Sequence, residues 1–208
     1  MSLLPQHLPR FTPDAYYTLE QWVGIEETTG ERYEYHDGHL LSVEAMAGGS
    51  PNHSRLSAMA ITLSGIGLLG SARQFSRCDP HTSDLRIAVD GGRRYLYADA
   101  VIVCGAPVYD AVVPSAIVNP VTVFEVLSPS SEGYDRGLKF EFYAGLDTLR
   151  EYVLIDQERR RVELRHRPDP RTDWRYETVT GTEAEVPLPS FGFGLPMGRL
   201  YRNWEAPA

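Results

Sequence analysis

The sequence predicts a mixed β-sheet with a helix packed on either side, in the α/β or α+β class and in a single domain. The chain has 208 residues, a length that suits one domain with a sizeable core. Its hydrophobic fraction of 42% is typical of a globular chain and not of a disordered one. Two helical patterns near the start are followed by a series of short strands rich in β-branched and aromatic residues.

Both ends of the chain lack periodicity. Residues 1–14 contain three prolines and residues 181–208 contain four. Proline removes a backbone donor and interrupts helices and central strands. We therefore expect irregular arms at both ends of a single domain that covers 1–208, with the folded core over about residues 18–167.

The first helix is expected to begin near Thr18, whose hydroxyl can cap it. Leu19, Trp22 and Val23 then fall on one helical face. The helix should end before the Thr28-Thr29-Gly30 segment, where two β-branched residues and a glycine interrupt the pattern.

The next segment, RYEYHDGHLLSVEAM, predicts a β-hairpin. Asp37-Gly38 is a strong turn signal, because both residues tolerate the positive φ that a two-residue hairpin turn needs. Residues that suit strands flank this turn: Tyr33, Tyr35, Leu40 and Val43. Glu34 lies in the first of the two strands.

A longer helix is predicted over residues 52–69. Ser50 is a suitable N-cap, and Pro51 suits the first helical position. The apolar residues of this segment recur at helical spacing and should form a buried stripe: Leu56, Met59, Ala60, Leu63, Ile66 and Gly67.

The rest of the chain predicts mostly strands. The expected strands are 73–78, 83–89, 97–103, 121–127, 151–155, 162–166 and 174–179. One helix, at about 132–145, interrupts this series.

Charge and cysteine content restrict the function classes. The net charge of −8 counts against strong non-specific nucleic-acid binding, which needs lysine and arginine to neutralise phosphates. Residues 158–167 nevertheless hold five arginines, either as a solvated turn or as a patch facing DNA. Cys78 and Cys104 each stand alone, so we expect two small buried side chains and no disulfide framework. Since no secretory signal or membrane span is evident, a cytoplasmic location is expected.

Two acidic residues stand in unusually apolar strands. Asp99 opens the run ADAVIVC, and Glu125 is embedded in VTVFEVL. A buried carboxylate is costly unless it is paired or binds a cation. Two such strands side by side could direct both carboxylates at Mg²⁺, which is held by one or two carboxylates together with water and phosphate. The alternative is that each acid faces solvent or pairs with an arginine.

The segment after Glu125 supports the metal interpretation. Asp135, Lys139 and Tyr143 follow one another at helical spacing and share a face. The short loop 128–131 joins this helix to the end of the Glu125 strand, so Lys139 can reach back to the acidic cluster. An ordinary surface pair between Asp135 and Lys139 is the alternative.

These residues resemble the Uma2 family of restriction-endonuclease-like proteins, a branch of the PD-(D/E)XK nuclease superfamily. The resemblance runs over about residues 18–167, and its most specific part is EVLSPS followed by DRGLKFEFY. It implies a restriction-endonuclease-like mixed β-sheet flanked by helices, with an N-terminal helix and β-hairpin. The hairpin with its Asp37-Gly38 turn adds further support.

The resemblance also implies the site residues. Asp99 and Glu125 match the metal-binding acids, and Glu34 matches a glutamate that would be a further ligand. Position 127, where the motif lysine usually stands, is leucine, and Lys139 matches a lysine displaced to the following helix. The implied reaction is Mg²⁺-dependent hydrolysis of DNA phosphodiester bonds, with Mn²⁺ as a substitute and a homodimer for cutting two strands.

Other residues and a second function were weighed. His36 and His53 are interpreted as a surface residue and a helix-start residue without catalytic roles. Ser128, Ser130 and Ser131 lack the surroundings of a catalytic serine and are interpreted as a turn and helix cap. The alternative function is a catalytically silent nuclease-fold module that binds protein or nucleic acid, which the net charge of −8 favours.

Overall fold

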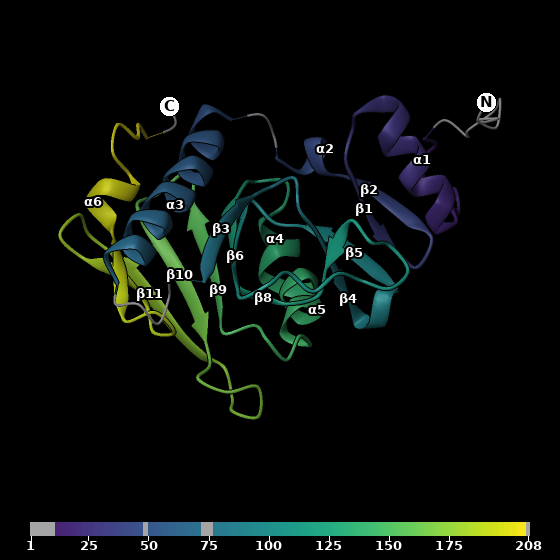
Figure 1. Cartoon of the computed structure of the whole chain (residues 1–208). Helices are drawn as coiled ribbons and strands as arrows, with labels where there is room; N and C mark the ends of the chain where they lie inside the picture. Colours follow the sequence, from purple (N-terminus) through teal and green to yellow (C-terminus); the bar gives the residue numbers. More distant parts are fainter. Residues whose placement is uncertain (1–10, 48–49, 72–76, 207–208) are drawn as a thin grey trace.

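The backbone forms two large mixed sheets where the sequence predicts one (Figure 1). The computed structural model describes residues 11–47, 50–71 and 77–206. Helices lie on the outer faces of the two sheets and between them, so the predicted mixed α+β class is confirmed. No helix among these described residues is long and apolar enough to cross a membrane.

The five-stranded sheet has the order β2-β1-β5-β4-β7. Its strands are β1 (Tyr33–His36), β2 (His39–Ser42), β4 (Arg86–Val89), β5 (Arg94–Tyr97) and β7 (Ala116–Ile117). All neighbours are antiparallel except β4 and β7. Asp37 and Gly38 both adopt positive φ between β1 and β2, as the predicted hairpin turn requires.

The six-stranded sheet has the order β11-β10-β9-β8-β6-β3. Its strands are β3 (Cys78–Thr82), β6 (Ala100–Cys104), β8 (Pro120–Leu127), β9 (Glu151–Asp156), β10 (Arg161–His166) and β11 (Arg175–Thr180). Strands β8 and β9 are parallel and are joined by a helical crossover, as parallel neighbours require. A separate hairpin pairs β12 (Glu185–Leu188) with β13 (Phe193–Pro196).

The helices are α1 (Leu19–Thr29), α2 (Val43–Ala47), α3 (Pro51–Gly70), α4 (Glu132–Tyr134), α5 (Phe140–Ala144) and α6 (Met197–Leu200). A 3₁₀ turn covers Asp90–Gly92, and a π-helical turn covers Asp135–Lys139 between α4 and α5. Thr18 caps α1 and Ser50 caps α3, both as predicted. The first helix continues to Thr29, two residues beyond its expected end, and Gly30 terminates it in the left-handed conformation.

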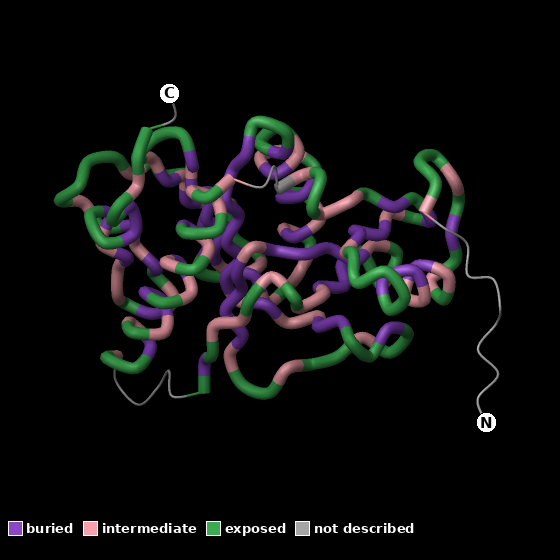
Figure 2. Tube along the Cα trace, turned by 90° about the horizontal axis from the view of Figure 1, so that it is seen from above, coloured by how far each residue is buried: buried purple, intermediate pink, exposed green. Residues whose placement is uncertain are grey.

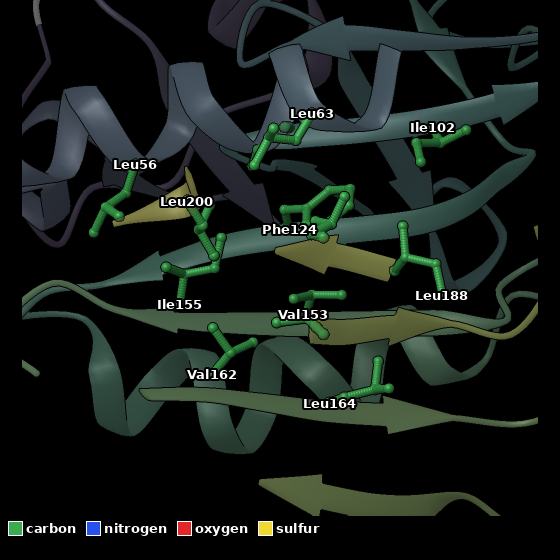
Figure 3. Packing of buried hydrophobic residues seen from close by; sticks show 14 of the residues in the cluster. Leu56, Leu63, Ile102, Phe124, Val153, Ile155, Val162, Leu164, Leu188 and Leu200 are labelled. Carbon is green, nitrogen blue, oxygen red and sulfur yellow. The ribbon is translucent and has the colours of Figure 1, made fainter. Parts of the chain in front are cut away.

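Three hydrophobic clusters hold the layers together. The largest packs α3, α6 and the β12–β13 hairpin on one face of the six-stranded sheet, around residues such as Leu56, Phe124 and Leu200 (Figure 3). A second lies between the other face of this sheet, α5 and the five-stranded sheet. A third packs α1 on the far face of the five-stranded sheet. Buried residues are therefore concentrated in the middle of the molecule, and the outer segments are mostly exposed (Figure 2).

Several predictions differ from the structure. The strand expected over 97–103 is interrupted at Ala98 and Asp99, because the chain passes there from β5 in one sheet to β6 in the other. Val43 begins helix α2 instead of continuing the hairpin. Most of the strand expected over 73–78 lies outside the described residues, as does most of the arm expected over 1–14.

The segment 181–208 was predicted as an irregular arm, and this was wrong. It contains the β12–β13 hairpin and α6, and it contributes Val186, Leu195 and Met197 to the largest cluster. Pro187 and Pro196 lie in this short hairpin, opposite Gly194 and Glu185.

The expectation of two separate cysteines was also wrong. Cys78 and Cys104 lie opposite each other in the β3–β6 ladder and form a disulfide. They are 26 positions apart in the chain, and only the pairing of these two strands brings them together.

Candidate active site

The alternation of side chains along β1 and β8 turns two glutamates toward the space between the sheets. On β8, Val123 and Leu127 pack in the cluster between the sheets, and Glu125 shares their face. On β1, Tyr33 and Tyr35 pack against α1, so Glu34 points to the opposite face. Both glutamates are buried, and Glu34 is fully so.

Asp99 lies at the passage from β5 to β6. Ala100, the first residue of β6, pairs with Phe124 of β8, so Asp99 lies immediately before β6 and near Glu125. Strands β6 and β8 are therefore neighbours as expected, and the expectation that the two carboxylates share an ion stays a prediction. Asp99 Oδ2 accepts a hydrogen bond of 2.6 Å from the backbone N–H of Val126, and it lies 3.3 Å from Nε2 of His53.

Lys139 occupies the space between the two glutamates. Its Nζ lies 2.9 Å from Glu125 Oε1, 3.2 Å from Glu34 Oε1 and 3.6 Å from Asp135 Oδ1. The π-helical turn between α4 and α5 directs both Asp135 and Lys139 inward, and both side chains are buried. Turns of this kind often occur at functional sites. The surface pair considered from the sequence is thus replaced by a buried cluster of one cation and three carboxylates.

The chain contains a signal for this site that the sequence analysis missed. Of its 20 lysine and arginine residues, 19 are arginine and Lys139 alone is lysine. An ammonium is a compact point charge on a flexible stem, whereas a guanidinium is a planar fork. The one position where the chain uses an ammonium is thus the one surrounded by buried acids.

A pocket of about 220 Å³ opens beside this cluster. Both sheets, α3 and the π-helical turn contribute charged residues to its lining: Arg32, Glu34, His53, Asp99, Glu125, Asp135 and Lys139. The pocket therefore brings together all four residues predicted for the site, which are Glu34, Asp99, Glu125 and Lys139.

Burial and mutual charge perturb the groups of the pocket. Burial raises the pKa of Glu125 well above its ordinary value, and Lys139 offsets only part of this effect. Burial also raises the pKa of Asp135. It would lower the pKa of Lys139, but Glu125, Glu34 and Asp135 together raise that pKa well above its ordinary value. Glu34 behaves differently, because Lys139 and hydrogen bonds from His36 and Tyr134 outweigh burial and lower its pKa.

The donor set suits a divalent cation held by two carboxylates. Glu125 Oε1 is buried and has no partner with hydrogen-bond geometry among the described residues, so its contact with Lys139 is an ion pair only. Asp99 lies immediately before β6, the strand that adjoins β8, and accepts a hydrogen bond from Val126, the residue after Glu125. No group of three or more His, Cys, Asp or Glu side chains in the described segments is arranged to share an ion. Two carboxylates with water and phosphate are sufficient for Mg²⁺.

Three residues near the pocket were not expected there. His53, at the start of α3, contacts Asp99, and hydrogen bonding to this carboxylate raises its pKa against the effect of burial. His36 and Tyr134 both contact Glu34. The contact of Tyr134 with Glu34 joins residues 100 positions apart, so the sequence around Tyr134 carries no signal for it.

Other residues lie as predicted or away from the pocket. Ser128 and Ser130 form a turn in which both hydroxyls donate to the carbonyl of Met46, as expected for residues without catalytic surroundings. Arg159 and Arg160 are exposed at the β9–β10 turn.

Comparison with known proteins gives concordant results. The model of the Uma2 family, described as "Putative restriction endonuclease", matches residues 13–198. "Uncharacterized protein slr1290" of Synechocystis sp. is 34% identical over 195 residues, which are 94% of this chain and 93% of that protein. "Uncharacterized protein sll1609" of the same organism is 31% identical over 169 residues, covering 81% and 90%.

A solved structure shares the fold. It is a crystal structure described as that of "a putative nuclease belonging to DUF820" from Anabaena variabilis. The match has a TM-score of 0.61 and 17% identity, and it covers 83% of this chain and 91% of the other.

Proposed function

Because this chain belongs to the Uma2 family, we propose that it is a metal-dependent endonuclease that hydrolyses DNA phosphodiester bonds at the pocket between its two sheets. Mg²⁺ is the proposed cofactor and Mn²⁺ its substitute. Asp99 and Glu125 are the proposed metal ligands, and Lys139 is the proposed catalytic cation.

One observation carries this proposal: the only lysine of the chain is buried among the acids that line the pocket. Desolvating an ammonium is costly, and well-packed apolar side chains would often stabilise such a position better than a buried ion pair. A purely structural role therefore gives little reason to bury this cation. Contact with a reacting phosphate does give one.

Each residue has a task that follows from its position. A bound Mg²⁺ would act as a Lewis acid on the phosphate and lower the pKa of water. Asp99 is oriented for metal binding by the Val126 N–H, and Glu125 offers Oε1, which accepts no hydrogen bond and pairs only with Lys139 among the described residues. The Lys139 ammonium can donate to a phosphate oxygen, where it stabilises the negative charge that develops as the bond to the leaving oxygen breaks.

The charge of the protein is compatible with this chemistry. The net charge of −8 and the acidic pocket disfavour a bare phosphate. A divalent cation would neutralise the carboxylates and mediate the approach of the nucleic acid. The same charge favours the second candidate, a catalytically silent module of nuclease fold, if no cation binds.

A cleavage assay tests the proposal. Supercoiled and single-stranded DNA would be incubated with the protein in Mg²⁺ or Mn²⁺, and Glu125→Gln should abolish cutting. Glu151→Gln is the matched control, because Glu151 is also a fully buried strand glutamate but is bonded to Thr122 and Ser190 outside the pocket. Absence of cutting of either DNA by the unmutated protein would favour the silent module.

Oligomeric state and location remain proposals. Cutting both strands of a duplex requires two sites, so we propose a homodimer; the proposed location is the cytoplasm. Size-exclusion chromatography with light scattering would show a single species of twice the 23.3 kDa chain mass.

A further inference from the structure

The carboxylate of Glu34 has partners on both of its oxygens. Oε1 accepts a hydrogen bond of 3.3 Å from the Tyr97 N–H and lies 3.2 Å from Lys139 Nζ. Oε2 accepts a hydrogen bond of 2.6 Å from the Tyr134 hydroxyl and lies 3.3 Å from His36 Nε2. Each oxygen of Glu34 therefore has two partners, whereas Glu125 Oε1 accepts no hydrogen bond and pairs only with Lys139 among the described residues.

These partners connect two parts of the fold. Glu34 and His36 are two positions apart on β1 and share a face of the five-stranded sheet. Tyr134 ends α4, next to the π-helical turn that carries Lys139. Tyr134 Oη also lies 3.2 Å from His36 Nε2, so the three side chains form one connected group.

Tyr134 contacts both members of the buried ion pair. Its hydroxyl donates to Glu34, while Lys139 Nζ lies 5.8 Å from the centre of its ring, within the range of a cation–π contact. The tyrosine thus fixes the direction of the carboxylate and covers one side of the ammonium.

A cation at Glu125 would change the partners of Lys139. Glu125 Oε1 is now 2.9 Å from the ammonium, and two cations that share one carboxylate oxygen repel each other. Glu34 and Asp135 are the partners that remain for Lys139 when Glu125 binds metal, and Glu34 is the nearer of the two. Lys139 would then stay beside the phosphate, because Glu34 is itself held by Tyr134 and His36.

We propose that Glu34 is a positioning residue for Lys139 and not a metal ligand, and that Tyr134 and His36 hold it in that role. This inference rests on the proposed nuclease function for its catalytic meaning. The positioning itself is a property of the folded protein, and it can be measured without cleavage.

The single lysine makes the measurement direct. Protein grown with lysine labelled with ¹⁵N at Nζ would give one side-chain ammonium signal, that of Lys139. A buried, paired ammonium exchanges its protons slowly, so this signal should be sharp both without metal and with saturating Mg²⁺. Tyr134→Phe removes one hydroxyl and should accelerate this proton exchange, which would broaden the signal.

Tyr95→Phe is the matched control. Tyr95 is fully buried and donates a hydrogen bond of 3.0 Å to the Asp110 carboxylate, away from the pocket. Tyr95→Phe therefore loses a hydrogen bond from a tyrosine hydroxyl to a carboxylate, as Tyr134→Phe does, but the Lys139 signal should not change. An unchanged signal and exchange rate in Tyr134→Phe would overturn the proposal.

Metal affinity separates the two roles of Glu34. Titration calorimetry with Mn²⁺ should show that Tyr134→Phe and Glu34→Gln bind within about threefold of the unmutated protein, whereas loss of a group essential for metal binding costs about tenfold or more. A tenfold weaker affinity in Glu34→Gln would make Glu34 a ligand and refute the positioning role.

Cleavage kinetics complete the test. In Tyr134→Phe, kcat should fall about tenfold while KM is unchanged, because the hydroxyl acts on the reacting centre and not on substrate binding. If the unmutated protein cuts no DNA, the proposed function fails, and the Lys139 signal still decides whether Tyr134 and Glu34 position the ammonium. An unchanged kcat beside a perturbed signal would overturn the catalytic part of the inference alone.

Discussion

Removal of the Lys139 charge is the perturbation whose effect the structure predicts most directly. Lys139→Met keeps much of the aliphatic stem and deletes an ammonium that lies within 3.6 Å of three carboxylates. For the pair at 3.2 Å, the Coulomb attraction is about 5 kcal/mol at an effective dielectric constant of about 20. Desolvation opposes this attraction, so it is not a net contribution to stability.

The expected loss of stability is the cost of leaving buried acids without their counter-ion. Removing one partner of a buried pair costs about 3–5 kcal/mol. For a protein of this size, each kcal/mol lowers Tm by about 2–4 °C, which gives a decrease of about 6–20 °C. The variant should nevertheless fold, because domain stabilities are about 5–15 kcal/mol.

The loss should depend on pH. The pKa values of Glu125 and Asp135 are already raised, and without Lys139 they rise further. A carboxyl with a raised folded-state pKa contributes stability that is present below its unfolded pKa and is lost as pH rises through the folded one. The deficit of Lys139→Met should therefore be small near pH 4 and complete near pH 8, since unfolded carboxyls titrate at about 3.9–4.3.

Thermal melts from about pH 4 to pH 8 in a chelator would measure this deficit. Lys139→Arg, which keeps the charge but not the compact head, should lose less stability. DNA cleavage by Lys139→Met should fall by about 10² or more, the scale seen when one electrostatic donor is lost. A Lys139→Met melt equal to that of the unmutated protein at pH 8 would refute the reasoning from the buried cluster.

The remaining predictions concern metal, pH and packing. Mn²⁺ at about 100 times its Kd should stabilise the protein by about 2.7 kcal/mol. Asp99→Asn should remove most of this gain in stability. An unchanged melting curve of the unmutated protein with excess Mn²⁺ would contradict the metal site. Burial raises the pKa of the Glu151 carboxyl, so the stability that this group contributes is lost as pH rises above about 4.3. The Tm of Glu151→Gln, compared with that of the unmutated protein, should therefore increase as pH rises above about 4.3, and parallel pH profiles of the two proteins would contradict this. In Gly67→Ala the new Cβ would lie 2.3 Å from the Phe193 ring, so urea unfolding should show a free energy of unfolding lower by about 1–3 kcal/mol. The control Gly70→Ala, whose Cβ would have nothing within 4 Å, should lose no stability. Equal effects of the two substitutions would contradict the close packing of α3 on β13.

Local sequence determined much of the framework around the site. Thr18, Ser50 and Asp37-Gly38 specify two helix starts and a hairpin turn through bonds and φ angles within a few residues of each signal. Alternation along β8 places Glu125 on one face of its strand, and helical spacing puts Asp135 and Lys139 together. The choice of lysine at position 139, in a chain that otherwise uses arginine, also belongs to the sequence alone.

Tertiary structure decided which of these local features meet. The passage of the chain between sheets at Asp99, the disulfide of Cys78 with Cys104 and the contact of Tyr134 with Glu34 all join segments that are distant in sequence. Each depends on which segments pack together in the folded chain, and the periodicity within one segment does not say which distant segment it will meet. The sequence therefore indicated which residues could form the site, and the packing of two sheets around one buried ammonium determined how they are arranged.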